Sequence, residues 1–411
     1  VIHHIACDAL SIDLIVKDLL YTYQKLRTDS QWKALPLRYQ YADYAIWQQQ
    51  LTEQLVYQQQ LAFWHQALDR PLPPLMLPKD HLPLQDSESQ STYYSVKLSE
   101  TVGKGLEKFA RQEGVTLYML GMTAFQTLMY RYTSQQEFVV GSPVTERHHS
   151  EFNEIVGLFL NVIPIVADLT ETPTMLSLLH RVKKTVLDSL SNNLVPFESL
   201  VEQYARYRTT HQQPLFQVMF TYQKVTSQAF SLPGIEVKPL PIAPSRSRFE
   251  ITAFLIDSGN DLTLQFEYDA SQFEKNTIVN MAEHLETLLG NMVEDPDLCI
   301  DTIKLLSAEK QYALTALNND TLDTTHHDTL LHELIVQQAH IRPDAVAIQF
   351  ENTALSYSQL DEKSNQLCRY LIENKVKTED VIAIFMHRCP EVFISIMAVL
   401  KCGAAYLPLD P

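Results

Sequence analysis

The stretch His3-His4-Ile5-Ala6-Cys7-Asp8-Ala9 contains two adjacent histidines that are separated from an aspartate by three residues. Apolar residues then recur at three- and four-residue spacing over residues 12–23, which predicts an amphipathic helix with Ser11 as its cap. The quoted residues therefore form a turn that gathers imidazole and carboxylate groups. An isolated histidine pair is more often packed or solvated than catalytic, so the rest of the chain decides what this turn does.

Length and composition are those of a globular protein with more than one domain. A single core rarely organises 411 residues, and 45% hydrophobic with 20% charged residues is typical of soluble chains. No apolar run is long enough to span a bilayer, which argues against a membrane role. The net charge of -17 and the lack of a basic stripe argue against nucleic acid as a partner. Five cysteines without paired metal spacing or a disulfide framework favour a cytoplasmic location.

Helical and strand patterns alternate through the first three quarters of the chain, which predicts a mixed α/β domain. After the first helix, further helices are predicted over residues 41–68, 117–132, 175–190 and 273–293. Strands are predicted over residues 138–140 and 217–222, and as a hairpin of residues 249–256 and 262–268.

The pattern lapses into a polar stretch, NNDTLDTTHHD, before the last part of the chain. We therefore expect a first domain over residues 1–305, a linker over 306–329 and a second domain over 330–411. In the second domain helices (330–340, 357–374, 391–401) alternate with strands (345–350, 381–385 and one after 401). This order predicts the beginning of a parallel-sheet α/β domain.

Six further segments, taken with the histidine motif, resemble the condensation domains of nonribosomal peptide synthetases, whose hallmark is HHxxxDG. In chain order they are YADYAIW (41–47), FW with LMLPKD (63–64, 75–80), GSPVTER (141–147), VGLFLN (156–161), PFE (196–198) and PLFQVMF (214–220). Chance matches have no reason to keep the order and spacing of a family.

This resemblance implies a chloramphenicol-acetyltransferase-like α/β fold of two related subdomains with the active site in a tunnel between them. Because the family motif lies well inside its domain, the resemblance also implies that the first subdomain is truncated here and that the isolated fragment is inactive or aggregates. The expected reaction is amide bond formation between a donor acyl or peptidyl thioester and the amine of an acceptor aminoacyl thioester. Both substrates would be held on the 4'-phosphopantetheine arms of upstream and downstream carrier domains.

The resemblance assigns roles to the motif residues. His4 matches the second histidine, and would take the amine proton as a general base or orient the nucleophile or the tetrahedral intermediate. Asp8 would pair with Arg147 in a bidentate contact that fixes the loop, and His3 has a packing role or a direct one, with packing favoured. Gly157 and Asn161 are candidates for the tunnel wall, with a tight turn or loop hydrogen bonds as the alternative.

Two departures from the family pattern motivate an alternative. Ala9 stands where glycine is usual, at a turn where a Cβ hinders some backbone angles or a close approach, and Glu146 stands where glycine commonly precedes Arg147. The alternative is a catalytically degenerate condensation domain that serves as a carrier-docking platform. A related acyltransferase using a diffusible thioester, or an epimerisation domain, fits the neighbouring segment less well. The dipeptide Ile163-Pro164, after Asn161-Val162, is more similar to the NTLP form found in condensation domains of the L-donor and starter types than to the NTQ form of D-donor types.

The tail resembles the first two core motifs of adenylation domains, in LSYSQL (355–360) and LKCGAAYLPLDP (400–411). With only ten glycines and no glycine-rich phosphate loop, this segment is expected to be scaffold, with ATP and Mg²⁺ relevant only to a complete adenylation domain. No cofactor or metal is expected to bind the chain directly. The pairs His148-His149 and His326-His327 and the loop SRSR (245–248) are expected to be solvated.

Overall fold

The structure is a computed structural model that describes residues 2–69, 72–81, 89–204, 215–225, 247–259, 261–319 and 329–411. Contacts within the chain divide it into two units, Val1–Ala313 and Leu314–Pro411.

The first unit is built on a six-stranded mixed sheet in the order β1-β6-β5-β4-β2-β3. Its strands are β1 (Ser91–Lys97), β2 (Glu137–Thr145), β3 (Leu160–Asp168), β4 (Val218–Lys224), β5 (Ile251–Asp257) and β6 (Leu262–Asp269). The central strand β4 is parallel to both neighbours, and the remaining pairs are antiparallel. Strands β2, β4 and β5 each contain a run of consecutive buried residues, as expected where a strand is covered on both faces.

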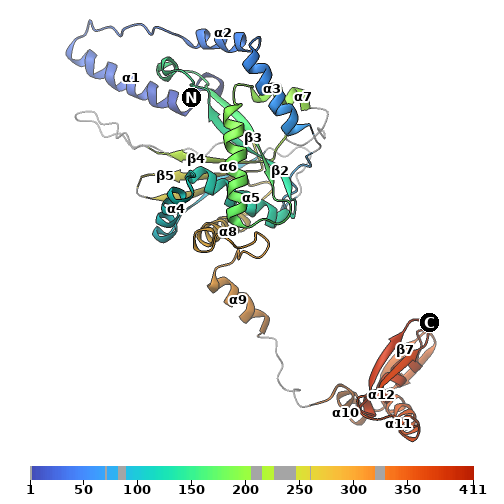
Figure 1. Ribbon diagram of the computed structural model, residues 1–411. Helices are drawn as coiled ribbons and strands as arrows, with labels where there is room; N and C mark the ends of the chain where they lie inside the picture. Colours follow the sequence, from blue (N-terminus) through green and yellow to red (C-terminus); the bar gives the residue numbers. More distant parts are fainter. Residues whose placement is uncertain are drawn as a thin grey trace. The chain divides into compact units, whose positions relative to one another are not determined.

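Helices cover this sheet and extend from it (Figure 1). They are η1 (His4–Ala6), α1 (Ala9–Thr28), α2 (Tyr41–Leu51), α3 (Leu55–Leu68), α4 (Glu100–Glu113), α5 (Leu117–Thr133), η2 (Ser150–Glu154), α6 (Met175–Ser191), α7 (Phe197–Tyr204) and α8 (Lys275–Glu294). Helix α9 (Ala308–Asn319) begins in the first unit and ends in the second. Helix α5 is the most buried of the described helices, with every residue from Met119 to Met129 inside the core. Its start is fixed by Thr116, whose hydroxyl accepts from the Met119 amide at 3.2 Å.

The helix predicted over residues 41–68 is wrong as a single element, because the chain turns between α2 and α3. The amides of Thr52 and Gln54 donate three residues back, to Gln49 and Leu51, instead of continuing the helical ladder. The turn lets the two helices bury different faces. Tyr44 of α2 joins a small aromatic cluster, while Trp64 of α3 joins the main core.

Other predicted elements differ at their ends or are missing from the prediction. The hairpin of β5 and β6 is present, and the glycine of its turn, Gly259, has φ +85°; Asn260 lies outside the described residues. The strand predicted over 138–140 is too short, because β2 continues through Gly141-Ser142-Pro143 while paired with β3. Strands β1 and β3 and helices α4 and α7 are not foreseen, although β1 follows a clear alternation of exposure.

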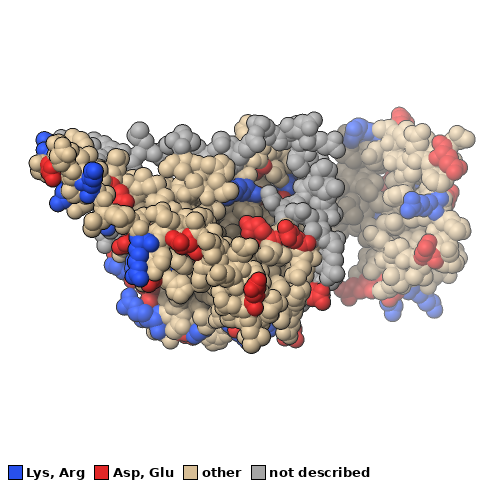
Figure 2. All heavy atoms as spheres, turned by 90° about the horizontal axis from the view of Figure 1, so that it is seen from above, with Lys and Arg blue, Asp and Glu red and all other residues tan. Residues whose placement is uncertain are grey.

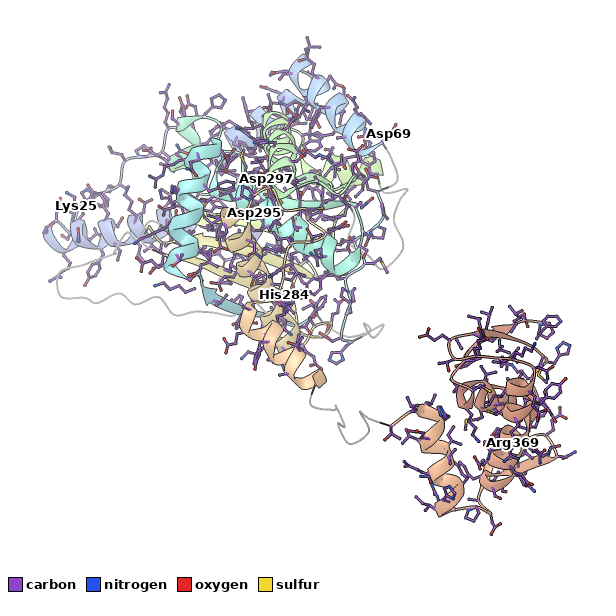
Figure 3. The ribbon with its side chains drawn as sticks, turned by 60° about the horizontal axis from the view of Figure 1, so that its bottom comes forward. Lys25, Asp69, His284, Asp295, Asp297 and Arg369 are labelled. Atoms are coloured by element: carbon purple, nitrogen blue, oxygen red, sulfur yellow. The ribbon has the colours of Figure 1, made fainter. Side chains whose placement is uncertain are left out.

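Helix α1 carries a largely exposed surface, and Ser11 is its one buried residue. Figure 3 shows the helix extending from the body of its unit, with Lys25 labelled near its outer end. Leu19 is 65% exposed and Tyr21 51% exposed, so the apolar pattern that predicts this helix stays largely uncovered by the described part of the chain.

The second unit contains α10 (Leu331–Ile341), α11 (Tyr357–Glu373), α12 (Pro390–Lys401), β7 (Val346–Phe350), β8 (Thr353–Ser356), β9 (Val381–Phe385) and β10 (Ala405–Leu409). The parallel pairing expected here exists between β9 and β10. The prediction misses β8, which forms an antiparallel hairpin with β7. The segment expected to be a linker contains α9, and residues 320–328 of that segment lie outside the described residues.

Candidate functional site

The histidine motif forms a tight loop that leads into α1. His4 opens η1, and its Nδ1 lies 2.8 Å from the carbonyl oxygen of Cys7. A carbonyl oxygen only accepts hydrogen bonds, so Nδ1 carries the hydrogen and the neutral ring leaves Nε2 as an acceptor. His4 is exposed, and its Nε2 makes no hydrogen bond to the described part of the chain. In the neutral ring, the loop therefore presents Nε2 to the outside as a hydrogen-bond acceptor.

Asp8 holds the end of this loop. Its Oδ1 accepts from the backbone N–H of Ser11 at 2.8 Å, which makes Asp8 the N-cap of α1. The prediction of Ser11 as the cap is wrong, because Ser11 lies in the first turn with its hydroxyl 2.7 Å from the Asp8 carboxylate. Ala9 is the first helical residue and is not among the residues with positive φ. The concern that glycine is needed here for its backbone angle is therefore removed.

Arg147, just beyond β2, holds the same carboxylate from another part of the sequence. Its Nη2 lies 3.0 Å from Oδ1 and 3.2 Å from Oδ2 of Asp8. Nη1 donates to the carbonyl oxygens of Phe152 and Ile155, and the guanidinium carbon stands 4.1 Å from the ring centroid of Phe159. The expected pairing is present, but one nitrogen spans both carboxylate oxygens because the other is taken by the two carbonyls.

The electrostatics of Asp8 suit a structural anion. Burial alone would raise the pKa of the Asp8 carboxyl, but hydrogen bonds from Ser11 and from Arg147, with the charge of Arg147, outweigh it. The pKa of Asp8 is therefore lowered below its usual value. The carboxylate is ionised at neutral pH, with four hydrogen-bond donors on its two oxygens, so it is poorly suited to carry protons.

Gly157 lies between the histidine loop and α2. Its carbonyl oxygen accepts from the Asp8 amide at 3.1 Å, and its own amide donates to the Ser11 hydroxyl at 3.0 Å. A Cβ built on Gly157 would lie 2.0 Å from Cδ2 of Tyr41, so only glycine allows the ring of Tyr41 to pack there.

Asn161, the other tunnel candidate, is 4% exposed and has its hydrogen-bonding capacity used inside the fold. Its Nδ2 donates to the carbonyls of Asn193 and Val195, and its Oδ1 accepts from the amides of Val162 and Phe197. These bonds tie the start of β3 to the segment before α7. They match the alternative expectation for Asn161, that its side chain satisfies hydrogen bonds of the surrounding loops.

His3 also has a local structural contact. Its Nδ1 accepts from the backbone N–H of Ile5 at 3.2 Å and so caps η1. Among the described residues, no grouping of three or more His, Cys, Asp or Glu side chains is arranged to hold a metal ion. His148 and His149 lie against Trp47, with His149 at 5.3 Å between ring centroids; His326 and His327 lie outside the described residues.

Two residues to which the motif analysis gives no role, Tyr44 and Glu146, both contact Phe159. Tyr44 of α2 is 1% exposed and donates its hydroxyl to the carboxylate of Glu146, which is 7% exposed. Burial raises the pKa of Glu146, against the Tyr44 hydrogen bond that lowers it. Tyr41 and Tyr44 are spaced to share one helix face, a signal that is visible in YADYAIW but does not identify the partner.

Figure 2 shows the distribution of charged side chains on one face of the molecule. On the face shown in Figure 2, acidic and basic side chains are interspersed among uncharged ones. No helix within the described ranges combines the length and apolar composition needed to cross a bilayer. In the loop SRSR, Ser245 and Arg246 lie outside the described residues.

The adenylation-like tail offers no free cation from its motif lysine. Nζ of Lys401 lies 2.6 Å from Asp361 Oδ1, 2.7 Å from Ser364 Oγ and 2.8 Å from Asn365 Oδ1. Gly403 has φ +72°, which marks a turn between α12 and β10. These contacts are compatible with the scaffold role expected for this segment.

Comparisons with known proteins agree on the family. A family model described as Condensation domain matches residues 1–315, and one described as AMP-binding enzyme matches residues 335–411. The whole chain is 35% identical to part of a linear gramicidin synthase from Brevibacillus parabrevis and 33% identical to a chondramide synthase of Chondromyces crocatus. It spans 8% and 11% of the lengths of these two proteins.

Solved structures are similar in fold. The full chain aligns with 32% of a four-domain nonribosomal peptide synthetase bound to AMP and glycine, with a TM-score of 0.71 and 22% identity. About three quarters of the chain, 74%, aligns with 69% of the X-domain in the complex of X-domain and OxyB from teicoplanin biosynthesis, with a TM-score of 0.68 and 24% identity. The mixed α/β condensation fold predicted from sequence is confirmed. The chain belongs to the condensation-domain family of nonribosomal peptide synthetases, with an AMP-binding segment after the condensation domain.

Proposed function

We propose that residues 1–315, within the intact synthetase, catalyse amide bond formation between two carrier-bound thioesters. The observation that carries this proposal is the state of His4, whose Nδ1 is held by the Cys7 carbonyl while Nε2 remains available on an exposed loop. An amine nucleophile must lose a proton as it attacks, and a nitrogen held as a hydrogen-bond acceptor can take that proton.

In this mechanism the acceptor amine nitrogen attacks the donor thioester carbonyl carbon. The C–N bond forms while His4 Nε2 accepts a proton from the amine; the C–S bond then breaks, and the departing thiolate of the donor arm takes up that proton from His4. Asp8 and Arg147 do not exchange protons with the substrates. They hold the loop in place. Holding the reactants in attack geometry can lower the activation barrier by on the order of 7 to 11 kcal/mol, so positioning supplies much of the rate enhancement.

The proposal includes partners and a location. Upstream and downstream carrier domains would bring the substrates on 4'-phosphopantetheine arms, and ATP with Mg²⁺ would serve a complete adenylation domain. The proposed location is the cytoplasm. Gly157 and Asn161 remain tunnel-wall candidates from the family resemblance alone, and the bonds of their polar groups within the fold support the alternative role of holding the loops.

Replacement of His4 tests the proposal. In the intact synthetase we expect His4→Ala to slow amide formation by about 100-fold or more, because general acid–base catalysis contributes about 10²–10⁴-fold. His4→Gln keeps a hydrogen-bonding group but no base. Equal loss in both variants supports proton transfer, whereas substantial activity in His4→Gln alone supports orientation of the amine.

The degenerate docking platform remains the second candidate. One of the two sequence departures that motivate this candidate is weakened, because Ala9 adopts an ordinary helical backbone. Efficient carrier loading with no amide product from the unmodified synthetase would favour the platform over the enzyme.

A further inference from the structure

Glu146 is a buried carboxylate that the reaction as described does not use. It lies directly before Arg147, and its side chain points to α2 instead of toward the Asp8 pair. Tyr44 donates its hydroxyl to Oε2, and Nε2 of Gln48 lies 3.3 Å from the same oxygen. Both donors come from α2, so one carboxylate fastens this helix to the end of β2.

The backbone of Glu146 makes a second connection. Its amide donates to the carbonyl of Phe159 at 2.9 Å, and Phe159 in turn donates its amide to Asp8 Oδ2 at 3.2 Å. Side chain and backbone of one residue therefore join α2 to the segment 157–159, which contacts the histidine loop.

Helix α2 reaches the same segment through Tyr41. The Tyr41 hydroxyl donates to the Leu158 carbonyl at 2.8 Å, and its ring lies where a Cβ on Gly157 would stand. Gly157 then bonds to Asp8 and Ser11, the residues that end the histidine loop. The path from Glu146 to this loop runs through packed or hydrogen-bonded neighbours at every step.

Packing makes this path stiff. Tyr44 lies 4.4 Å from Phe159 and 5.2 Å from Phe152 between ring centroids. Close-packed aromatic groups resist small displacements, so a shift of α2 is passed on to the segment 157–159.

We propose that Glu146 is a positioning residue for His4, acting through Tyr44 and α2 on the segment that carries the histidine loop. This inference rests on the proposed function of His4. A residue of this kind affects the rate of the chemical step more than substrate binding, because a misplacement of about 1 Å can cost about 100-fold.

The test uses the intact synthetase with the variants Glu146→Ala and Glu146→Gln. Glu154→Ala is the matched control, because Glu154 is an exposed glutamate in the same segment between β2 and β3. We expect Glu146→Ala to lower kcat by on the order of 10- to 100-fold, with KM for the loaded acceptor carrier changed by less than about twofold. Glu146→Gln keeps an oxygen that accepts from Tyr44 and should restore most of kcat. Glu154→Ala should behave as the unmodified protein.

Amide hydrogen exchange provides a readout that does not depend on the reaction. The Asp8 amide bonds to Gly157, so its exchange should accelerate in Glu146→Ala and stay unchanged in Glu146→Gln. Should Glu146→Ala fail to fold, Tyr44→Phe removes one hydroxyl from the same contact and takes its place with the same expected results.

Unchanged kcat together with unchanged exchange in Glu146→Ala would overturn the inference, as would a loss confined to KM. His4→Ala run in parallel separates this inference from the proposed function. If His4→Ala forms product at the unmodified rate, the function assigned to His4 fails. The exchange of the Asp8 amide then decides alone whether Glu146 positions the loop.

Discussion

The Asp8–Arg147 pair is almost fully buried, at 9% and 3% side-chain exposure, while His4 beside it is exposed. A buried ion pair contributes little net stability when complete, but the loss of one partner leaves an uncompensated charge. The contrast separates the residues that hold the loop from the residue that meets substrate.

Removal of Arg147 should therefore be costly. We expect Arg147→Ala to destabilise this region by about 3–5 kcal/mol, because the Asp8 carboxylate stays buried without its cation. Hydrogen exchange of residues 150–162 in the intact synthetase measures the change. Arg111→Ala is the control, since Arg111 forms an exposed pair with Glu107 on α4 and its loss should leave exchange unchanged. Equal effects of the two variants would contradict the structural role of Arg147.

Asp8 also predicts a dependence on pH. Its pKa is lower in the folded protein than the ordinary value of 3.8, so its contribution to stability is complete above that value. The contribution is lost as the pH falls below 3.8 through the folded pKa. We expect Asp8→Asn to be less stable than the unmodified protein at neutral pH, with the difference shrinking below pH 3.8 in exchange measurements. A difference that grows on acidification would have the wrong sign.

At the scale of elements, the contact between α2 and the segment 157–159 depends on the absence of a Cβ atom at Gly157. We expect Gly157→Ala to push the Tyr41 ring away and cost about 1–3 kcal/mol, the usual range for overpacking. Local exchange of residues 155–160 is the readout. Gly103→Ala in α4 is a matched control, since nothing lies within 4 Å of its added Cβ and helix propensity favours alanine.

The outcome of Gly157→Ala depends on Tyr41. In a variant that also carries Tyr41→Leu, the penalty should fall, because the clash is with the ring. A penalty that is the same with and without the ring would show that Gly157 is required for another reason.

Elements with one uninterrupted pattern could be predicted from the sequence. Residues 117–132 read as a helix and form α5, and the hairpin of β5 and β6 follows from its alternation and its turn. The break between α2 and α3 could not be predicted, because residues 41–68 keep helical spacing and the chain turns only to bury its halves in different clusters. The strand character of Gly141-Ser142-Pro143 was hidden by residues typical of loops.

The same distinction holds at the site. The partnership of Asp8 with Arg147 follows from a resemblance that spans most of the chain, and the structure contains it. The contact between Tyr44 and Glu146 joins residues about a hundred positions apart, and neither type indicates the other. Long-range pairs of this kind need the three-dimensional arrangement.

At the scale of the molecule, the whole chain is similar to part of a linear gramicidin synthase, and it spans 8% of the length of that protein. It carries a net charge of -17, and both signs are interspersed on the face seen in Figure 2. The proposed reaction requires loaded carrier domains, so each activity measurement above uses the intact synthetase.

The most direct test of the central claim follows the mass of the acceptor carrier. Donor and acceptor carriers of the intact synthetase are loaded with amino acids, the reaction is stopped at intervals, and the acceptor arm is analysed by mass spectrometry. Our account predicts a dipeptidyl thioester on the acceptor arm of the unmodified protein, and an arm that keeps its single amino acid in His4→Ala despite normal loading. Equal product in the two proteins would contradict the claim that His4 carries the condensation.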